Sequence, residues 1–207
     1  PPVLSSILKG EISAGHKGEV RRVCVLFSDI RAFTARSENQ SPQVIISLLN
    51  RYFEQMVDCV HCYDGTVDKF IGDGLMAFFG APNSLDNSAQ YALNAATTML
   101  DRLDVLNQEL RNEGVEPLNV GIGLHFGDVV VGHVGSSGRH EYTAIGDTVN
   151  VASRLEDLTR DLGYPILLSE DFHNALGENI HCTELGYQSL KGHSGMKVFG
   201  VGVNGDV

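Results

Sequence analysis

Two aspartates each follow a short apolar segment that is typical of a buried β-strand. Asp29 comes after the run Val23–Ser28, and Asp73 comes shortly after Ile71, between two glycines that favour a tight turn. We therefore expect both carboxylates at strand ends. A single aspartate in such a place is more often a turn residue than a ligand. Two carboxylates together can hold divalent cations. Two cations can neutralise the charge on the attacking and the leaving oxygen when a phosphate group is transferred.

A second polar pair lies further along the chain, on a predicted helix. The segment Tyr142–Arg154 reads as a short strand, a glycine turn and the start of a helix. Asn150 and Arg154 are four residues apart in the sequence, so they share one face of that helix. A guanidinium stays charged and binds phosphate oxygens, whereas an amide can orient a hydroxyl. The neighbouring apolar stripe, which would pack the helix, consists of Val151, Leu155, Leu158 and Leu162.

Three segments together point to a family. In their order and spacing, Phe27–Ile30, Lys69–Asp73 and Tyr142–Arg154 resemble the class III nucleotidyl cyclases, over about residues 20–203. The resemblance implies an adenylyl cyclase that converts ATP to 3′,5′-cyclic AMP and pyrophosphate with two Mg²⁺ or Mn²⁺ ions per active site. It also implies an α/β fold of the α+β type, a ferredoxin-like or polymerase-palm-like sandwich. Its central, mostly antiparallel sheet would be flanked by helices, and the domain would form a head-to-tail homodimer.

The resemblance assigns a role to each candidate residue. Asp29 and Asp73 would bind the metal ions, and the backbone carbonyl of Ile30 would add a ligand. Asn150 would hold the ribose 3′-oxygen in line with the α-phosphate, and Arg154 would stabilise charge in the transition state. Backbone N–H groups at the start of a predicted helix or turn would bind the β- and γ-phosphates. They belong to Ile30, Arg31, Ala32, Phe33 and Thr34.

Lys69 and Thr143 match the positions that read the purine base in this family. Lysine is only a donor, so it suits the N1 acceptor of adenine and would face the N1–H donor of guanine. A buried unpaired donor costs about 1–3 kcal/mol, so adenine is favoured. Thr143 can accept from the adenine amino group, although many adenylyl cyclases have aspartate there. Threonine at this position marks a subgroup that resembles the bicarbonate-responsive cyclases, which makes bicarbonate regulation a hypothesis.

Three questions stay open at this point. A guanylyl cyclase is the alternative enzyme, but a carboxylate in place of Lys69 would suit guanine better. A catalytically silent nucleotide-binding or dimerisation module is the alternative of another class. A basic residue near the end of the chain often contacts the triphosphate in relatives, and the sequence does not choose among Lys191, Lys197 and His193.

Length and charge limit the remaining choices. The 207 residues are 43% hydrophobic, and we expect a linker of a larger protein over residues 1–18 and one catalytic domain over residues 19–207. The net charge of −11 would repel nucleic acid, whereas bound metal ions would reverse the local sign for a nucleoside triphosphate. No stretch approaches about 18 uninterrupted apolar residues. We expect a cytoplasmic location, with any upstream regulatory or membrane domain outside this sequence.

Cys59 and Cys62 have the spacing of half a zinc site. No second CxxC pair follows, and Cys59 continues the apolar side of a predicted helix, so we favour a structural role. The four cysteines are too few and too irregularly placed for a disulfide scaffold, which favours a reducing compartment.

The apolar patterns predict the element order βα ββ α ββ αβαββ, with helices on one face of the sheet. Two long amphipathic helices run from Ser41 to Val60 and from Ala89 to Leu110. Two adjacent strands, Val120–Phe126 and Val129–Val134, are expected to turn at Gly127-Asp128. The other expected strands are Arg22–Ser28, Thr66–Ile71, Leu75–Phe79, Ile166–Leu168, Cys182–Tyr187 and Val198–Val203, with a short helix near Glu170–Ala175 and a loop at Ser136–Arg139.

Overall fold

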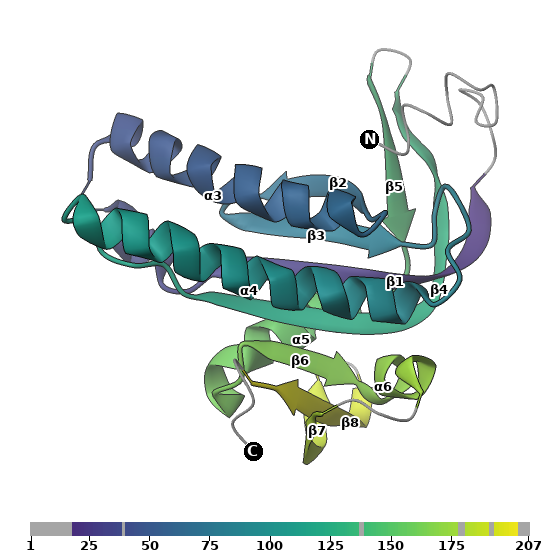
Figure 1. The fold of residues 1–207 in the computed structure, drawn as a ribbon. Helices are drawn as coiled ribbons and strands as arrows, with labels where there is room; N and C mark the ends of the chain where they lie inside the picture. Colours follow the sequence, from purple (N-terminus) through teal and green to yellow (C-terminus); the bar gives the residue numbers. More distant parts are fainter. Residues whose placement is uncertain (1–17, 39, 137–138, 178–180, 191–192, 203–207) are drawn as a thin grey trace.

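The computed structural model describes residues 18–38, 40–136, 139–177, 181–190 and 193–202. The first half of the chain forms β1 (Glu19–Ile30), α2 (Phe33–Ser37), α3 (Pro42–Cys62), β2 (Thr66–Ile71), β3 (Gly74–Phe79) and α4 (Ser88–Asn112). The second half forms β4 (Val120–Ser136), β5 (Arg139–Ile145), α5 (Asp147–Leu162), β6 (Ile166–Ser169), α6 (Glu170–Leu176), β7 (Thr183–Leu190) and β8 (His193–Val201). Helices α3 and α4 lie side by side across the sheet (Figure 1).

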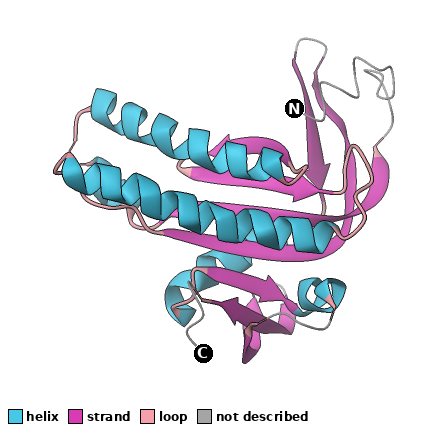
Figure 2. Ribbon diagram, in the orientation of Figure 1, coloured by secondary structure: helices cyan, strands magenta, loops and turns pink. Residues whose placement is uncertain are grey.

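The strands form one sheet in the order β2-β3-β1-β4-β6-β8-β7, and β5 pairs with the second half of β4 (Figure 2). Strands β4 and β6 run parallel, whereas the other described pairs run antiparallel. The prediction of a mostly antiparallel α+β sheet flanked by helices is therefore confirmed. Strand β1 pairs with β4 along its whole length and with β3 at its end, where Ser28 lies opposite Leu75. The end of β1 thus lies beside the β2–β3 turn.

Alternating side chains of β1 divide the interior into two layers. Leu26 belongs to the layer under α3 and α4, where Tyr52 is fully buried. Val25 faces the opposite layer, which α5 covers. The prediction that the helices lie on one face of the sheet is wrong. The reason is that α5 has its own apolar stripe, including Val151 and Leu155, which is buried against the second face.

Strand β4 is continuous, where the sequence predicts two strands that turn at Gly127-Asp128. Both residues lie within the antiparallel ladder, opposite Val23 and Arg22 of β1. The long partner strand therefore keeps this stretch extended, and the predicted turn is wrong. The hairpin is instead made by β4 and β5, which pair from Val130 opposite Ile145 outward.

The glycines of β4 allow α5 to approach the sheet closely. A Cβ at Gly123 would lie 2.3 Å from the carbonyl oxygen of Ala152 and 2.4 Å from the backbone nitrogen of Glu156. A Cβ at Gly121 would lie 2.1 Å from Oγ1 of Thr159. Any side chain at these positions would push the helix away from the strand. The glycine signal in this segment thus reports helix packing rather than a turn.

The long helices and the β2–β3 hairpin are confirmed. Ser41 caps α3, since its hydroxyl accepts from the N–H of Val44 at 3.4 Å. Ser169 caps α6 in the same way and accepts from the N–H of Phe172 at 3.1 Å. Strand β8 begins earlier than predicted, because its pairing with β7 extends to Leu190. Residues 1–17 of the expected linker, residues 137–138 of the expected loop, Lys191 and Val203 lie outside the described residues.

Two broader expectations concern thiols and membranes. The four cysteines are free, and Cys59 is buried in the core while Cys62 is exposed. Burial raises the pKa of the Cys59 thiol to about 11, as expected for a packing residue. Among the described helices, none combines the length and the apolar character that a bilayer span requires.

Replacing Gly123 by alanine tests the contact between α5 and β4. The new methyl group would collide with backbone atoms, which cannot rotate away, so Gly123→Ala is expected to lower the free energy of unfolding by about 2 kcal/mol or more. Urea denaturation followed by circular dichroism measures the loss. Gly127→Ala is the matched control, because its nearest atom is the Thr148 hydroxyl at 2.7 Å, which belongs to a side chain. Equal losses in the two variants would contradict the proposed contact.

Candidate active site

Asp29 and Asp73 lie together at the end of β1. Asp29 is the penultimate residue of that strand, and Asp73 lies in the turn between β2 and β3. Both are half-buried, and their carboxyl groups are in hydrogen-bonding contact. Burial, followed by the charge of Asp73, raises the pKa of Asp29 to about 6. Gly74 leaves room for this contact, since a Cβ there would lie 3.1 Å from Oδ1 of Asp29.

This pair of carboxylates fits Mg²⁺ or Mn²⁺. Two carboxylates in contact repel each other when both are ionised, and a divalent cation beside them would remove that repulsion. In the part of the chain that the structure describes, no third His, Cys, Asp or Glu completes a metal-binding group. The remaining ligands would be backbone oxygens such as that of Ile30, phosphate oxygens or water. An open ligand set of this kind is typical of Mg²⁺ sites that bind nucleotide phosphates.

Of the five residues expected to bind phosphates through backbone N–H groups, two are already engaged. The N–H of Ile30 bonds to the Asp29 carboxylate, and the N–H of Arg31 donates to the carbonyl of Asn119 at 2.8 Å. The remaining three, Ala32 to Thr34, surround the start of α2. Ala32 is in the left-handed region with φ 57°, and α2 begins without a side-chain cap. The expected donor set is therefore reduced to these three residues.

The Arg31 side chain ties the end of β1 to the end of α5. Its guanidinium donates to the carbonyl oxygens of Thr159 at 3.1 Å and Tyr164 at 3.2 Å. Thr159 itself packs on Gly121 of β4, and Tyr164 lies just after the end of α5. The Arg31 side chain is thus engaged in positioning the two elements.

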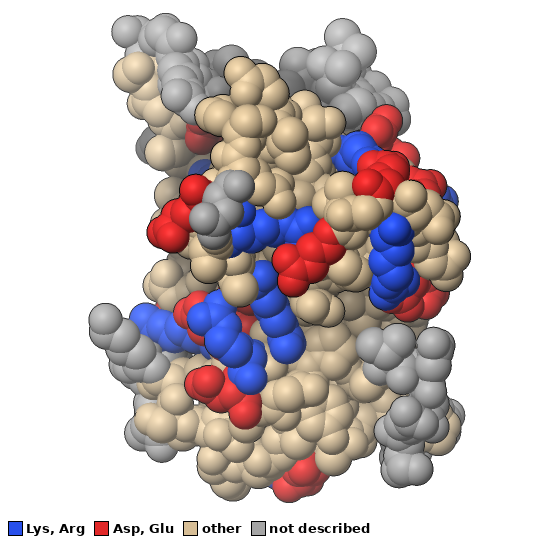
Figure 3. All heavy atoms as spheres, turned by 90° about the vertical axis from the view of Figure 1, so that its left-hand side faces the viewer, with Lys and Arg blue, Asp and Glu red and all other residues tan. Residues whose placement is uncertain are grey.

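Basic side chains gather at the same end of the molecule, despite the net charge of −11. Figure 3 views the left-hand side of Figure 1, where β1 ends, and Lys and Arg side chains cluster near the middle of that face with Asp and Glu beside them. The charge of Arg160 reaches this site, because it lowers the pKa of Asp29 against the effect of burial. Local positive charge favours an anionic substrate at this end.

Lys69 and Thr143 line one cavity of about 350 Å³. The β2 residue Lys69 is half-buried, with Nζ 3.9 Å from a carboxylate oxygen of Glu141. Thr143 of β5 is 6% exposed. A cavity of this size with apolar walls and few polar groups is typical of a site for an aromatic ligand. Its apolar walls include Phe27, Met76, Ile145 and Val149.

Asn150 and Arg154 lie on α5, which borders this cavity through Val149. Asn150 is exposed and Arg154 is half-buried, so both side chains are accessible. Within the described part of one chain, no hydrogen bond or ion pair joins them to Asp29 or Asp73. The structure thus brings together two sets, Asp29 with Asp73, and Lys69 with Thr143 and Val149 at the start of α5. Phe27 and Ile71, which also line the cavity, each lie two residues before one of the two aspartates.

Two acidic residues lie close to these sets without a motif that singles them out. Glu156 lies over Gly121, where a Cβ would be 2.7 Å from Oε1, and Gly121 is the ladder partner of Asp29. Burial, followed by the charge of Asp29, raises the pKa of Glu156 to about 8. Asp68 accepts a hydrogen bond from Thr143. The sequence offered one signal for Asp68, which is an acidic residue next to Lys69 on a predicted strand. It offered none for Glu156, because the position of Glu156 depends on its contact with Gly121, far away in the sequence.

The basic candidates near the C-terminus are only partly described. Lys197 forms an ion pair with Glu184 at 2.9 Å and lies 5.8 Å from the ring centre of Phe199. Lys191 and the side chain of His193 lie outside the described residues. The choice among the three stays a prediction.

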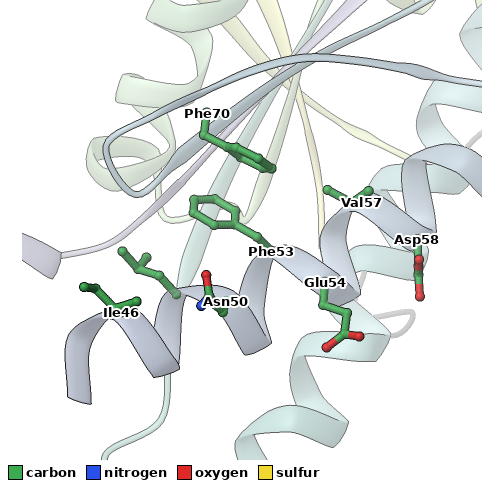
Figure 4. Close-up of a pocket in the computed structure, with 8 residues that line it drawn as sticks. Ile46, Asn50, Phe53, Glu54, Val57, Asp58 and Phe70 are labelled. Carbon is green, nitrogen blue, oxygen red and sulfur yellow. The ribbon is translucent and has the colours of Figure 1, made fainter. Parts of the chain in front are cut away.

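A separate apolar groove of about 540 Å³ runs along α3 beside β2. Phe53 and Phe70 point toward each other across it, with ring centres 4.2 Å apart (Figure 4). Phe70 and Ile71 are about half exposed, at 50% and 52%. The hairpin that carries Asp73 therefore presents apolar surface to solvent.

Comparisons with known proteins identify the family of this chain. The profile of the family described as "Adenylate and Guanylate cyclase catalytic domain" matches residues 16–202. Adenylate cyclase 1 of Rhizobium meliloti is 35% identical over 196 residues, which cover 93% of this chain and 30% of that protein. This chain thus spans less than a third of the length of that relative.

Solved structures give the same result. The adenylyl cyclase CyaB from P. aeruginosa superimposes with a TM-score of 0.83 at 34% identity, covering 90% of this chain and 96% of that one. The guanylyl cyclase Cya2 superimposes with a TM-score of 0.85 at 34% identity, covering 91% and 96%. Because the family profile spans nearly the whole sequence and the fold agrees, the chain belongs to the adenylate and guanylate cyclase catalytic domain family.

Proposed function

We propose that this domain is an adenylyl cyclase, which converts ATP to 3′,5′-cyclic AMP and pyrophosphate at sites shared between two copies of the chain. The observation that carries the proposal is that the structure pairs Asp29 with Asp73 and Lys69 with Thr143, while no described hydrogen bond or ion pair joins the first pair to the second. Asp29 and Asp73 form one set, and Lys69, Thr143 and the start of α5 form the other, with which we group Asn150 and Arg154 of the same helix. A head-to-tail homodimer would place the first set of one copy opposite the second set of its partner, twice.

Each set has a distinct task in the proposed reaction. Asp29 and Asp73 would hold two Mg²⁺ or Mn²⁺ ions, which supply charge neutralisation at the attacking oxygen and the leaving pyrophosphate. Asn150 would hold the ribose so that its 3′-oxygen attacks the α-phosphorus in line. Arg154 would bind phosphate oxygens as negative charge accumulates. Backbone N–H groups of residues 32–34 would bind the triphosphate.

Adenine is the proposed base because Lys69 presents only donors to the cavity. Guanine would bring its N1–H against the ammonium and leave two donors facing each other. Guanylyl cyclase stays the alternative, since structures of guanylyl cyclases are among the similar ones. A catalytically silent module is disfavoured, because all the matched residues Asp29, Asp73, Asn150 and Arg154 are present.

Exposed apolar side chains support the proposed homodimer. Large apolar side chains that are exposed to solvent indicate an interaction site when they lie close together near candidate functional residues. Near the two sets of functional residues they include Phe70, Ile71, Val134 and Ile145. Further proposals are regulation by bicarbonate, control by an upstream or membrane domain of a longer protein, and a cytoplasmic location, where ATP is available. A bicarbonate titration at fixed pH that leaves the rate unchanged would remove the first of these.

Mixing two inactive variants tests the shared sites and the substrate together. Asp73→Ala and Arg154→Ala are each expected to lower cyclic AMP formation from ATP by at least about a hundredfold. An equal mixture should recover about a quarter of the wild-type rate, because half of randomly formed dimers are mixed and each mixed dimer has one intact site. The measurement is product formation from labelled ATP and GTP with Mn²⁺. Activity of either variant alone at the wild-type rate, or no recovery on mixing, would contradict the proposal.

Metal removal should expose the repulsion between Asp29 and Asp73. The folded-state pKa of Asp29, about 6, lies above its ordinary value of 3.8. The folded state therefore binds more protons than the unfolded state, and its stability falls as pH rises from about 4 to 6. In EDTA at pH 8, Asp73→Asn should raise the melting temperature by about 1–3 °C and flatten this pH dependence.

Added Mn²⁺ should reverse the order of the two proteins. The wild type should gain stability from Mn²⁺, and Asp73→Asn should gain much less, because it lacks one ligand. Differential scanning calorimetry from pH 4 to 8 makes the comparison. Asp104→Asn, at an exposed position on α4, controls for a general effect of charge. The same response to pH and Mn²⁺ in all three proteins would exclude a metal site at Asp29 and Asp73.

A further inference from the structure

A buried carboxylate, that of Asp68, lies behind the two residues proposed to read the base. Asp68 belongs to β2, at an irregularity in the β2–β3 pairing between Val67 and Lys69. Its side chain is 0% exposed, although the residue as a whole is partly exposed through its backbone. Burying an ionised group is costly unless hydrogen bonds compensate it. The contacts of this carboxylate therefore indicate what keeps it there.

The shortest described contact of Asp68 is with Thr143. Oγ1 of Thr143 donates to Oδ2 of Asp68 at 2.7 Å. Lys69 Nζ is 3.9 Å from Oδ1, which is too long for a hydrogen bond, and Oδ1 has no hydrogen-bond partner. Burial raises the pKa of Asp68, while the hydrogen bond from Thr143, then the charge of Lys69 and a hydrogen bond from the Ala144 backbone, lower it. The hydroxyl of Thr143 is thus the described side chain that donates to this carboxylate, beside the backbone N–H of Ala144.

A hydroxyl has a single proton, so a hydroxyl that donates to one partner can only accept hydrogen bonds from any other. Thr143 is buried and lines the cavity, and it gives its proton to the buried side chain of Asp68. Only the oxygen lone pairs of Thr143 remain for a ligand. We infer that Asp68 is a positioning residue that fixes Thr143 as a hydrogen-bond acceptor toward the base and so selects a 6-amino purine over a 6-oxo purine.

This inference deepens the proposed function and rests on it for the identity of the ligand. Adenine has an amino donor at position 6, and guanine has a carbonyl acceptor there. A threonine without Asp68 could rotate its hydroxyl and serve either base, so Thr143 alone discriminates weakly. When the Thr143 proton is engaged by Asp68, guanine would place its 6-carbonyl oxygen against the Thr143 oxygen, so that two acceptors face each other. Lys69 would read N1, and the pair of Asp68 and Thr143 would read position 6.

Replacing Asp68 by leucine removes the acceptor and keeps the branched shape of the side chain. Asp68→Leu is expected to lower the ratio of kcat/KM for ATP to kcat/KM for GTP by about fivefold or more, the effect of one hydrogen bond. Thr143→Val should lower the ratio similarly. The double variant should show no further loss than Thr143→Val alone, because Asp68 acts through Thr143. Asp104→Leu, at an exposed position on α4, should leave the ratio unchanged.

A merely structural Asp68 would give a different pattern. In that case Asp68→Leu would lower the melting temperature but keep the ratio within about twofold, or its effect would multiply with that of Thr143→Val, and either result would overturn the inference. If Asp68→Leu does not fold, Asp68→Ala replaces it. If the wild type forms no cyclic nucleotide, the proposed function fails. Affinities for 3′-deoxy-ATP and 3′-deoxy-GTP, measured by calorimetry, then decide the inference. Asp68→Leu should lose the preference for 3′-deoxy-ATP by the same factor. A wild type that binds both nucleotides equally well would overturn the inference.

Discussion

The close packing of α5 on the glycines of β4 is the constraint on which the rest of the structure depends. It sets the depth of the helix that carries Asn150 and Arg154, since the backbone of Ala152 would be 2.3 Å from a Cβ at Gly123. The same contact lays Glu156 over Gly121, opposite Asp29 in the ladder. The end of β1 is joined to the end of this helix through Arg31. One packing interaction therefore links the elements that carry the two sets of candidate residues.

The acidic groups at this site lower the stability of the domain when no ligand is bound. Asp29 and Asp73 are in contact, and burial raises the pKa of Asp29 and of Glu156. Asp68 is buried with one oxygen unpaired. Groups of this kind destabilise a fold unless a ligand compensates them, which is why perturbed carboxylates mark candidate functional sites. Bound cations at Asp29 and Asp73 would supply that compensation, and their charge would also attract a triphosphate to a domain with a net charge of −11.

Local sequence patterns were sufficient to predict the helices and strands that bury an apolar face. They were insufficient where the conformation depends on a segment far away in the sequence. The capped helix α3 and the β2–β3 hairpin follow from periodicity and turn residues. Gly127-Asp128 reads as a turn because its role depends on β1 and α5, which lie far away in the sequence. The contact between Asp68 and Thr143 spans 75 residues and leaves no periodic signal. Motifs thus indicated the candidate residues, and only the fold shows which of them meet and what lies behind them.

A crystal structure with Mn²⁺ and a non-hydrolysable ATP analogue tests the central claim most directly. The account predicts cations bound by Asp29 and Asp73 of one copy. It predicts the adenine base in the cavity of Lys69 and Thr143 of the other copy, with the Thr143 oxygen accepting from the 6-amino group. Cations bound elsewhere, or a nucleotide held entirely by one copy of the chain, would contradict it.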